Sequence, residues 1–132
     1  MVVLIAAGLG VTGAGQAAAV AHYRFIVGGC GMPAKPEWLP LLCAEMPAGA
    51  HFQTIAIGRE EVWPVHRRCA ELGGHLRSGL EDTFYLPDGS KTDSNGRLIA
   101  ELVRIARECG REPATPEQAR QIVGVLPVPH GG

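Results

Sequence analysis

The sequence lacks the features that mark several classes of protein. Its four cysteines form no C-x-x-C pair, which argues against a zinc knuckle or a disulfide framework and favours reduced thiols in the cytoplasm. The net charge is −1 and only 5% of the residues are aromatic, so no nucleic-acid partner is expected. The basic cluster of His66, Arg67 and Arg68 is therefore interpreted as a solvated helix face. No Lys or Arg precedes the first apolar run, so neither a signal peptide nor a membrane partner is expected.

A dinucleotide-binding fingerprint near the N-terminus is incomplete. The apolar run Val2–Ala7 leads into Gly8-Leu-Gly10-Val-Thr-Gly13, which is a literal G-x-G-x-x-G. An NAD-binding fold also needs an acidic residue about 20 positions further on to hold the ribose hydroxyls. No Asp or Glu occurs before Glu37. An NAD-binding oxidoreductase is thus the weakest alternative, and residues 1–24 form a glycine-rich segment of unassigned register.

Apolar strands alternate with helices along the rest of the chain, and no hairpin signal joins neighbouring strands. This alternation predicts an α/β fold with a parallel sheet. A capping box at Thr115 opens the last short helix, and the stretch after it, 125–132, is predicted to be a flexible tail. The expected strands are 23–27, 51–57 and 73–82. Four helices are expected. The first covers 36–46, the second begins with an acidic first turn at Glu60-Glu61, the third runs from Asp93 or Ser94 to Cys109, and the fourth covers 116–123.

The strand predicted at 73–82 places charge at the carboxyl end of an otherwise apolar element. Alternation puts His75, Arg77, Gly79 and Glu81 on one face, and Asp82 follows at the tip. Ligands and catalytic groups collect at that end of parallel α/β sheets. A second interpretation stays open, in which Arg77 and the two carboxylates form an ion pair that only braces the strand end. His75 is expected to be a hydrogen-bonded interior residue and not a metal ligand.

Several stretches resemble the C-terminal part of the β-keto acid cleavage enzymes, the family of 3-keto-5-aminohexanoate cleavage enzyme. They are Phe25-Ile-Val-Gly-Gly, Gly31-Met-Pro-Ala, Ile55-Ala-Ile-Gly-Arg59, Gly73–Asp82, Tyr85-Leu-Pro-Asp-Gly89, Ser94-Asn95 and Gly110–Arg120. The resemblance implies a (β/α)8 TIM barrel and a divalent metal, typically Zn2+. It also implies a reaction in which a β-keto acid and acetyl-CoA give acetoacetate and a new acyl-CoA, as in lysine fermentation.

The resemblance also assigns roles to three residues. Glu81 matches the carboxylate metal ligand, Arg77 the catalytic arginine, and Asp82 the acid that orients it. Because Arg77 and Asp82 are five positions apart, their contact requires the chain to bend at Glu81. The family's His-x-His ligand pair is missing from this sequence, and one carboxylate alone does not hold a catalytic zinc.

A complete barrel takes about 250 residues, so the 132 residues here are interpreted as about three βα units, with residues 25–124 as a partial TIM-barrel domain. The open sheet edges predict a homo-oligomer, or a need for the missing half of the barrel.

The sequence leaves two candidate functions open. The first is part of a metal-dependent β-keto acid cleavage site. The second is a non-catalytic barrel fragment, which is either an acyl-CoA-binding or assembly module or the product of a broken gene. Arg59, after a strand end, is either a ligand for a CoA phosphate or an ordinary surface residue.

Overall fold

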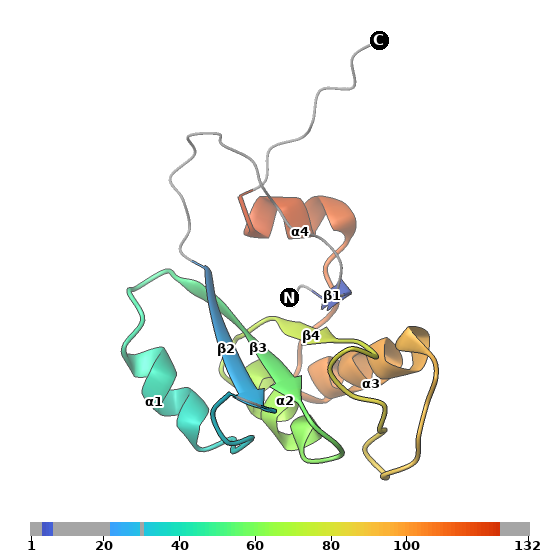
Figure 1. Cartoon of the computed structure of the whole chain (residues 1–132). Coiled ribbons are helices and arrows are strands. Elements are labelled where there is room, and N and C mark those ends of the chain that lie inside the picture. Colours follow the sequence, from blue (N-terminus) through green and yellow to red (C-terminus); the bar gives the residue numbers. More distant parts are fainter. Residues whose placement is uncertain (1–3, 7–21, 30, 125–132) are drawn as a thin grey trace.

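A computed structural model describes residues 4–6, 22–29 and 31–124 of the chain. The fold is α/β, with helices packed on parallel strands (Figure 1). The strands are β1 (Leu4–Ala6), β2 (His22–Gly28), β3 (His51–Ile57) and β4 (Leu76–Ser78), and the helices are α1 (Trp38–Ala44), α2 (Val62–Glu71), α3 (Asn95–Glu108) and α4 (Pro116–Ile122). No helix in these described stretches has both the length and the apolar character that crossing a membrane requires.

The strands pair in parallel, as the alternation of strands and helices predicts. β2 pairs with β3 along its whole length, from His22 opposite His51 to Gly28 opposite Ile57. β1 pairs with β4, and one parallel bridge between Gln53 and His75 joins the two strand pairs. The spatial order is therefore β2, β3, β4, β1. The G-x-G-x-x-G motif and the predicted tail lie outside the described residues, and the domain boundaries proposed from the sequence stay predictions.

One face of the strands carries the hydrophobic core. Phe52, Thr54 and Ala56 alternate along β3 and are all buried, and a side chain on Gly74 would collide with both the Phe52 ring and the Cys69 thiol of α2. This face of β3 therefore packs on α2. Burial of so many aliphatic side chains supplies most of the free energy that holds the helices to the strands. The core consists of Val27, Leu39, Phe52, Ala56, Val62, Trp63, Val65, Cys69, Ala70, Leu76, Leu86, Leu98, Leu102, Ile105 and Ala106.

Two predicted helix starts are wrong, whereas the capping box is confirmed. Glu60 and Glu61 do not form the first turn of α2, which begins at Val62. The amides of Val62 and Trp63 bond to carbonyls three residues back, so a tighter turn precedes the helix. A similar turn delays α1 to Trp38. At α4, the Thr115 hydroxyl accepts from the Gln118 amide at 3.2 Å, and the Gln118 side chain accepts from the Thr115 amide at 2.9 Å.

His66 is not on a solvated face, contrary to the sequence-based interpretation. It is fully buried beside Trp63, and neither ring nitrogen has a hydrogen-bond partner among the residues that the structure describes. Arg67 and Arg68 do reach the surface, where they pair with Glu108 and Glu71. Position 66 lies one turn from Val62 and Ala70, which are also buried, so helical geometry turns it toward the core. Burial lowers the pKa of His66 to about 4.

Acidification should therefore weaken the fold. The pKa of His66 is lower in the folded chain than in the unfolded one, so between about pH 6.5 and pH 4 the unfolded state binds the extra proton and gains stability. We expect the free energy of unfolding to fall by ~2 kcal/mol from pH 7 to pH 5 through this residue. Urea unfolding at the two pH values measures the loss. His66→Leu should remove that part of the pH dependence, and an unchanged slope in this variant would contradict the assignment.

Three imidazole rings stack at the amino ends of β2, β3 and β4. The His75 ring lies 5.9 Å from the His22 ring and 5.2 Å from the His51 ring, nearly parallel to both. His51 Nδ1 and His75 Nε2 are 2.9 Å apart, so one ring donates a hydrogen bond to the other. Burial, followed by the nearby His51 and His22, lowers the pKa of His75 to about 4. His75 is thus the hydrogen-bonded interior residue predicted, and it adds to the acid sensitivity in the same direction as His66.

Candidate active site

The charged segment is a short strand followed by a turn, not one long strand. β4 ends at Ser78, and the amides of Asp82 and Thr83 both donate to the Gly79 carbonyl, at 2.8 and 3.1 Å. The Leu80 amide donates to Asn95 Oδ1 at 2.9 Å. Because these bonds satisfy backbone groups that a sheet would otherwise pair, the turn replaces the strand predicted for the second half of 73–82. The bend needed to bring Arg77 and Asp82 together therefore starts at Gly79, before Glu81.

The turn brings the three predicted site residues together. Arg77 Nη2 contacts a Glu81 oxygen, and it lies 3.5 Å from Asp82 Oδ2. The Arg77 side chain is 15% exposed and that of Asp82 is 5% exposed, whereas the Glu81 side chain is 59% exposed. One guanidinium nitrogen thus lies close to both a buried carboxylate and a solvent-facing carboxylate, at the carboxyl end of β4.

Burial perturbs the carboxylate of Asp82. Its Oδ2 is buried without a hydrogen-bond partner in the described residues. Burial raises the pKa of Asp82, the charge of Glu81 raises it further, and Arg77 opposes both effects. A carboxylate with a raised pKa next to a fixed positive charge accepts a proton more readily than a free aspartate does. Such groups collect at functional sites, although ion pairs inside a fold show the same perturbation.

The loop after β3 contacts the same turn. The Gly58 amide donates to the Asp82 carbonyl at 3.1 Å, which ties the end of β3 to the charged group. The guanidinium of the next residue, Arg59, stacks 4.4 Å from the Tyr85 ring centre and pairs with Glu60 at 3.3 Å. Sequence reasoning did not identify Tyr85 as a partner of Arg59. The only signal for it was its place in a stretch that resembles the family.

A family model described as beta-keto acid cleavage enzyme matches residues 8–125. The chain belongs to this family. The match begins well before Phe25 and therefore includes much of the glycine-rich segment in which we identified no resemblance.

Curated relatives of this beta-keto acid cleavage enzyme homologue carry two names. The 3-keto-5-aminohexanoate cleavage enzymes of Acetoanaerobium sticklandii and Fusobacterium nucleatum are 38% and 36% identical to it, each over 79% of this chain and 38% of their own length. The 3-oxoadipate:acetyl-CoA acetyltransferase of Cupriavidus necator is 32% identical over 85% of this chain and 40% of its own length. The chain thus spans well under half the length of these relatives.

The described part of this family member does not contain a complete metal site. No three His, Cys, Asp or Glu side chains within it come together in a way that could hold a metal ion. Glu81 offers one exposed carboxylate, and Cys43, Cys69 and Cys109 are free thiols placed elsewhere. Since catalytic zinc normally takes three protein ligands, these residues by themselves do not fit the metal that the resemblance implies.

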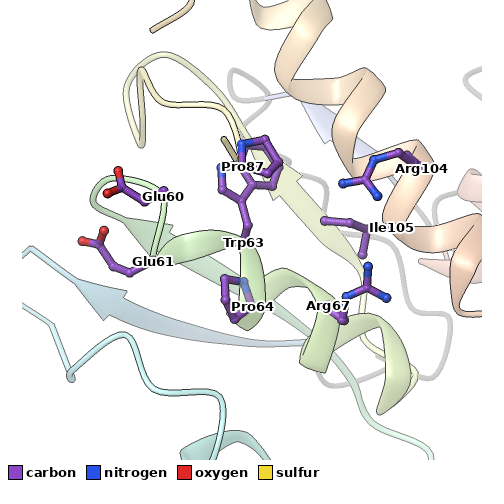
Figure 2. A pocket seen from close by; sticks show the side chains of 8 residues that line it. All are labelled: Glu60, Glu61, Trp63, Pro64, Arg67, Pro87, Arg104 and Ile105. Atoms are coloured by element: carbon purple, nitrogen blue, oxygen red, sulfur yellow. The ribbon is translucent and has the colours of Figure 1, made fainter. Parts of the chain in front are cut away.

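A groove of about 540 Å³ lies between α2 and α3 but is separate from the charged turn. Figure 2 shows Glu60 and Glu61 at one end of it and Arg67 and Arg104 at the other, with Trp63 between them. Both arginines already pair with Glu108. The groove contains none of the three predicted site residues, so in this family member the candidate active site is the turn after β4.

Proposed function

We propose that this chain carries part of the active site of an enzyme that cleaves a β-keto acid with acetyl-CoA, giving acetoacetate and a new acyl-CoA. The observation that carries the proposal is Arg77 held between Glu81 and Asp82 at the carboxyl end of a parallel strand. The names of the relatives support the substrate class, because two specify cleavage of a keto acid and one specifies acetyl-CoA.

Arg77 suits the charge that this reaction develops. Breaking the bond next to the keto group passes through an enolate, and a fixed guanidinium stabilises that negative charge where it forms. A guanidinium keeps its proton in proteins, so Arg77 acts by electrostatics and by binding the substrate carboxylate. The buried Asp82 holds Arg77 in place, and with its raised pKa it is the group that could take up a proton at Oδ2.

The divalent metal is part of the proposal, although this chain offers only one ligand for it. When bound, a metal would supply Lewis acidity at the keto oxygen. Glu81 would be its carboxylate ligand, since its oxygens face solvent beside Arg77. The other ligands would come from outside the described residues or from another polypeptide. Arg59, stacked on Tyr85 beside the strand end, stays a candidate for contacting a CoA phosphate.

The experiment that tests this function follows acetoacetate and acyl-CoA by mass spectrometry after 3-keto-5-aminohexanoate or 3-oxoadipate is mixed with acetyl-CoA, zinc and the purified chain. Asp82→Asn keeps the shape of the buried side chain but removes its charge, and we expect a loss of turnover of roughly 100-fold. Asp88→Asn is the matched control. Asp88 lies in the following loop and bonds to Ser90, so this change should leave turnover intact.

Two results would contradict the proposal. If Asp82→Asn and Asp88→Asn lowered turnover equally, Asp82 would have no specific role in the reaction. No acetoacetate from any of these mixtures, together with no binding of acetyl-CoA, would favour the non-catalytic fragment.

A further inference from the structure

One face of β2 and β3 is left uncovered by the described helices. Since Phe52, Thr54 and Ala56 point toward α2, the alternation of a strand turns Ile55 to the opposite face. The register then sets Ile26 of β2 beside Ile55, and Arg24 beside Gln53 on the same face. Gln53 is buried, whereas Ile26 is 49% exposed. In Figure 1, α2 lies behind β3, and no described helix lies in front of β2 and β3. Parallel strands normally have both faces covered by other parts of a protein, so this face is a candidate surface for binding another polypeptide.

The edges of the strand order are also open within the described residues. β2 pairs there only with β3, and β1 pairs there only with β4. Exposed apolar side chains occur on β2 and on α1, which Figure 1 shows beside β2. These are Tyr23 of β2, 38% exposed, and Trp38 and Leu41 of α1, 41% and 62% exposed. An open strand edge is a surface onto which another strand adds readily.

We propose that a second copy of this chain covers this face and these edges, so that two chains close one eight-stranded parallel barrel. The described residues supply four strands in the order β2, β3, β4, β1, all parallel. A two-fold axis running along the strands keeps every strand of both copies parallel. It places β2 of each copy against β1 of the other, and the two sets of four strands make the eight that a closed α/β barrel uses.

The position of β1 favours a second copy over a polypeptide that carries the rest of the family fold. That remainder would need both outer edges of β2, β3 and β4 to complete a barrel. The outer edge of β4 is already taken by β1, from Leu4 opposite Leu76 to Ala6 opposite Ser78. Another copy needs only the edges that stay open. Because the axis follows the strands, the Arg77 groups of both copies would lie on the same rim of the barrel.

The test is the oligomeric state of the full chain, measured by sedimentation velocity and native mass spectrometry over a concentration series. We expect a dimer in the wild type. Ile26→Glu replaces an apolar side chain of the covered face by a carboxylate and should weaken the dimer at least ~10-fold. Phe84→Glu is the matched control, since Phe84 is 56% exposed but lies in the loop after β4, and this variant should dimerise as the wild type does. Circular dichroism verifies that both variants are folded.

A second measurement locates the interface. Amide hydrogen exchange in β2 should slow as the dimer forms, because its open edge becomes paired. A monomer at every concentration would overturn the proposal. So would a dimer weakened equally by both variants, a dimer in which β2 exchanges as fast as in the monomer, or a chain that associates only with a different polypeptide. The inference rests on the strands and not on the proposed chemistry, so either can fail without the other.

Discussion

Replacing Arg77 by lysine should lower the proposed turnover of β-keto acid at least ~100-fold. Lysine keeps the positive charge, but a compact ammonium group replaces the planar guanidinium, whose Nη2 contacts both Glu81 and Asp82. The proposed substrate carboxylate and enolate would then lose the planar donor that a guanidinium offers to a carboxylate. Initial rates of acetoacetate formation measure the effect, and titration with acetoacetate followed by NMR should show weaker binding as well.

Arg104 provides a matched control for this change. Like Arg77, it pairs with a glutamate four residues on, here Glu108, but it lies on the surface of α3. Arg104→Lys should leave both turnover and acetoacetate binding unchanged. If the two arginine variants behave alike, Arg77 only braces the end of β4, and the ion-pair interpretation made from the sequence holds instead.

Replacing Gly28 by alanine should destabilise the fold by more than ~3 kcal/mol. Gly28 ends β2 with a φ of 74°, a conformation that disfavours any side chain. A Cβ here would also lie 1.8 Å from the Ile57 carbonyl oxygen, far inside van der Waals contact. Relief would require β2 and β3 to move apart at the very end where the candidate site lies. Urea unfolding at pH 7 measures the loss.

Gly49 separates the two causes. Its φ is 80°, close to that of Gly28, but a Cβ added there meets no atom within 4 Å. Gly49→Ala should therefore cost only the ~1 kcal/mol of the left-handed backbone. Equal losses in the two glycine variants would mean that the contact with Ile57 relaxes freely and that the end of β2 is less tightly packed than the structure indicates.

The sequence predicts the elements of this fold better than the details of its site. The pattern of apolar residues and the glycines predict β3 at His51–Ile57 and the end of α3 just before Gly110, because these signals depend only on nearby residues. The turn at Gly79 was missed, since bonds from Leu80 to Asn95 and from Gly58 to Asp82 decide it, and those partners are distant in sequence. Burial of His66 was missed for a related reason. Its two arginine neighbours indicated solvent, while packing of the helix decided otherwise.

The grouping of Arg77, Glu81 and Asp82 was predicted, but the resemblance to a family carried much of that prediction. From residues alone, a site and a bracing ion pair explained the pattern equally well. The sequence did not predict that Asp82 is buried while Glu81 is exposed. This difference depends on how the turn packs against the loop after β3.

The pairing of β1 with β4 has a consequence for the order in which the chain folds. Leu4 meets Leu76 across more than half of the sequence, and closing so large a loop is entropically costly for a strand of only three residues. The units from β2 to α3 form contacts between near neighbours and can assemble first. β1 would then dock last, onto an edge that β4 and α3 have already built, and it would be the first strand to leave when the chain opens.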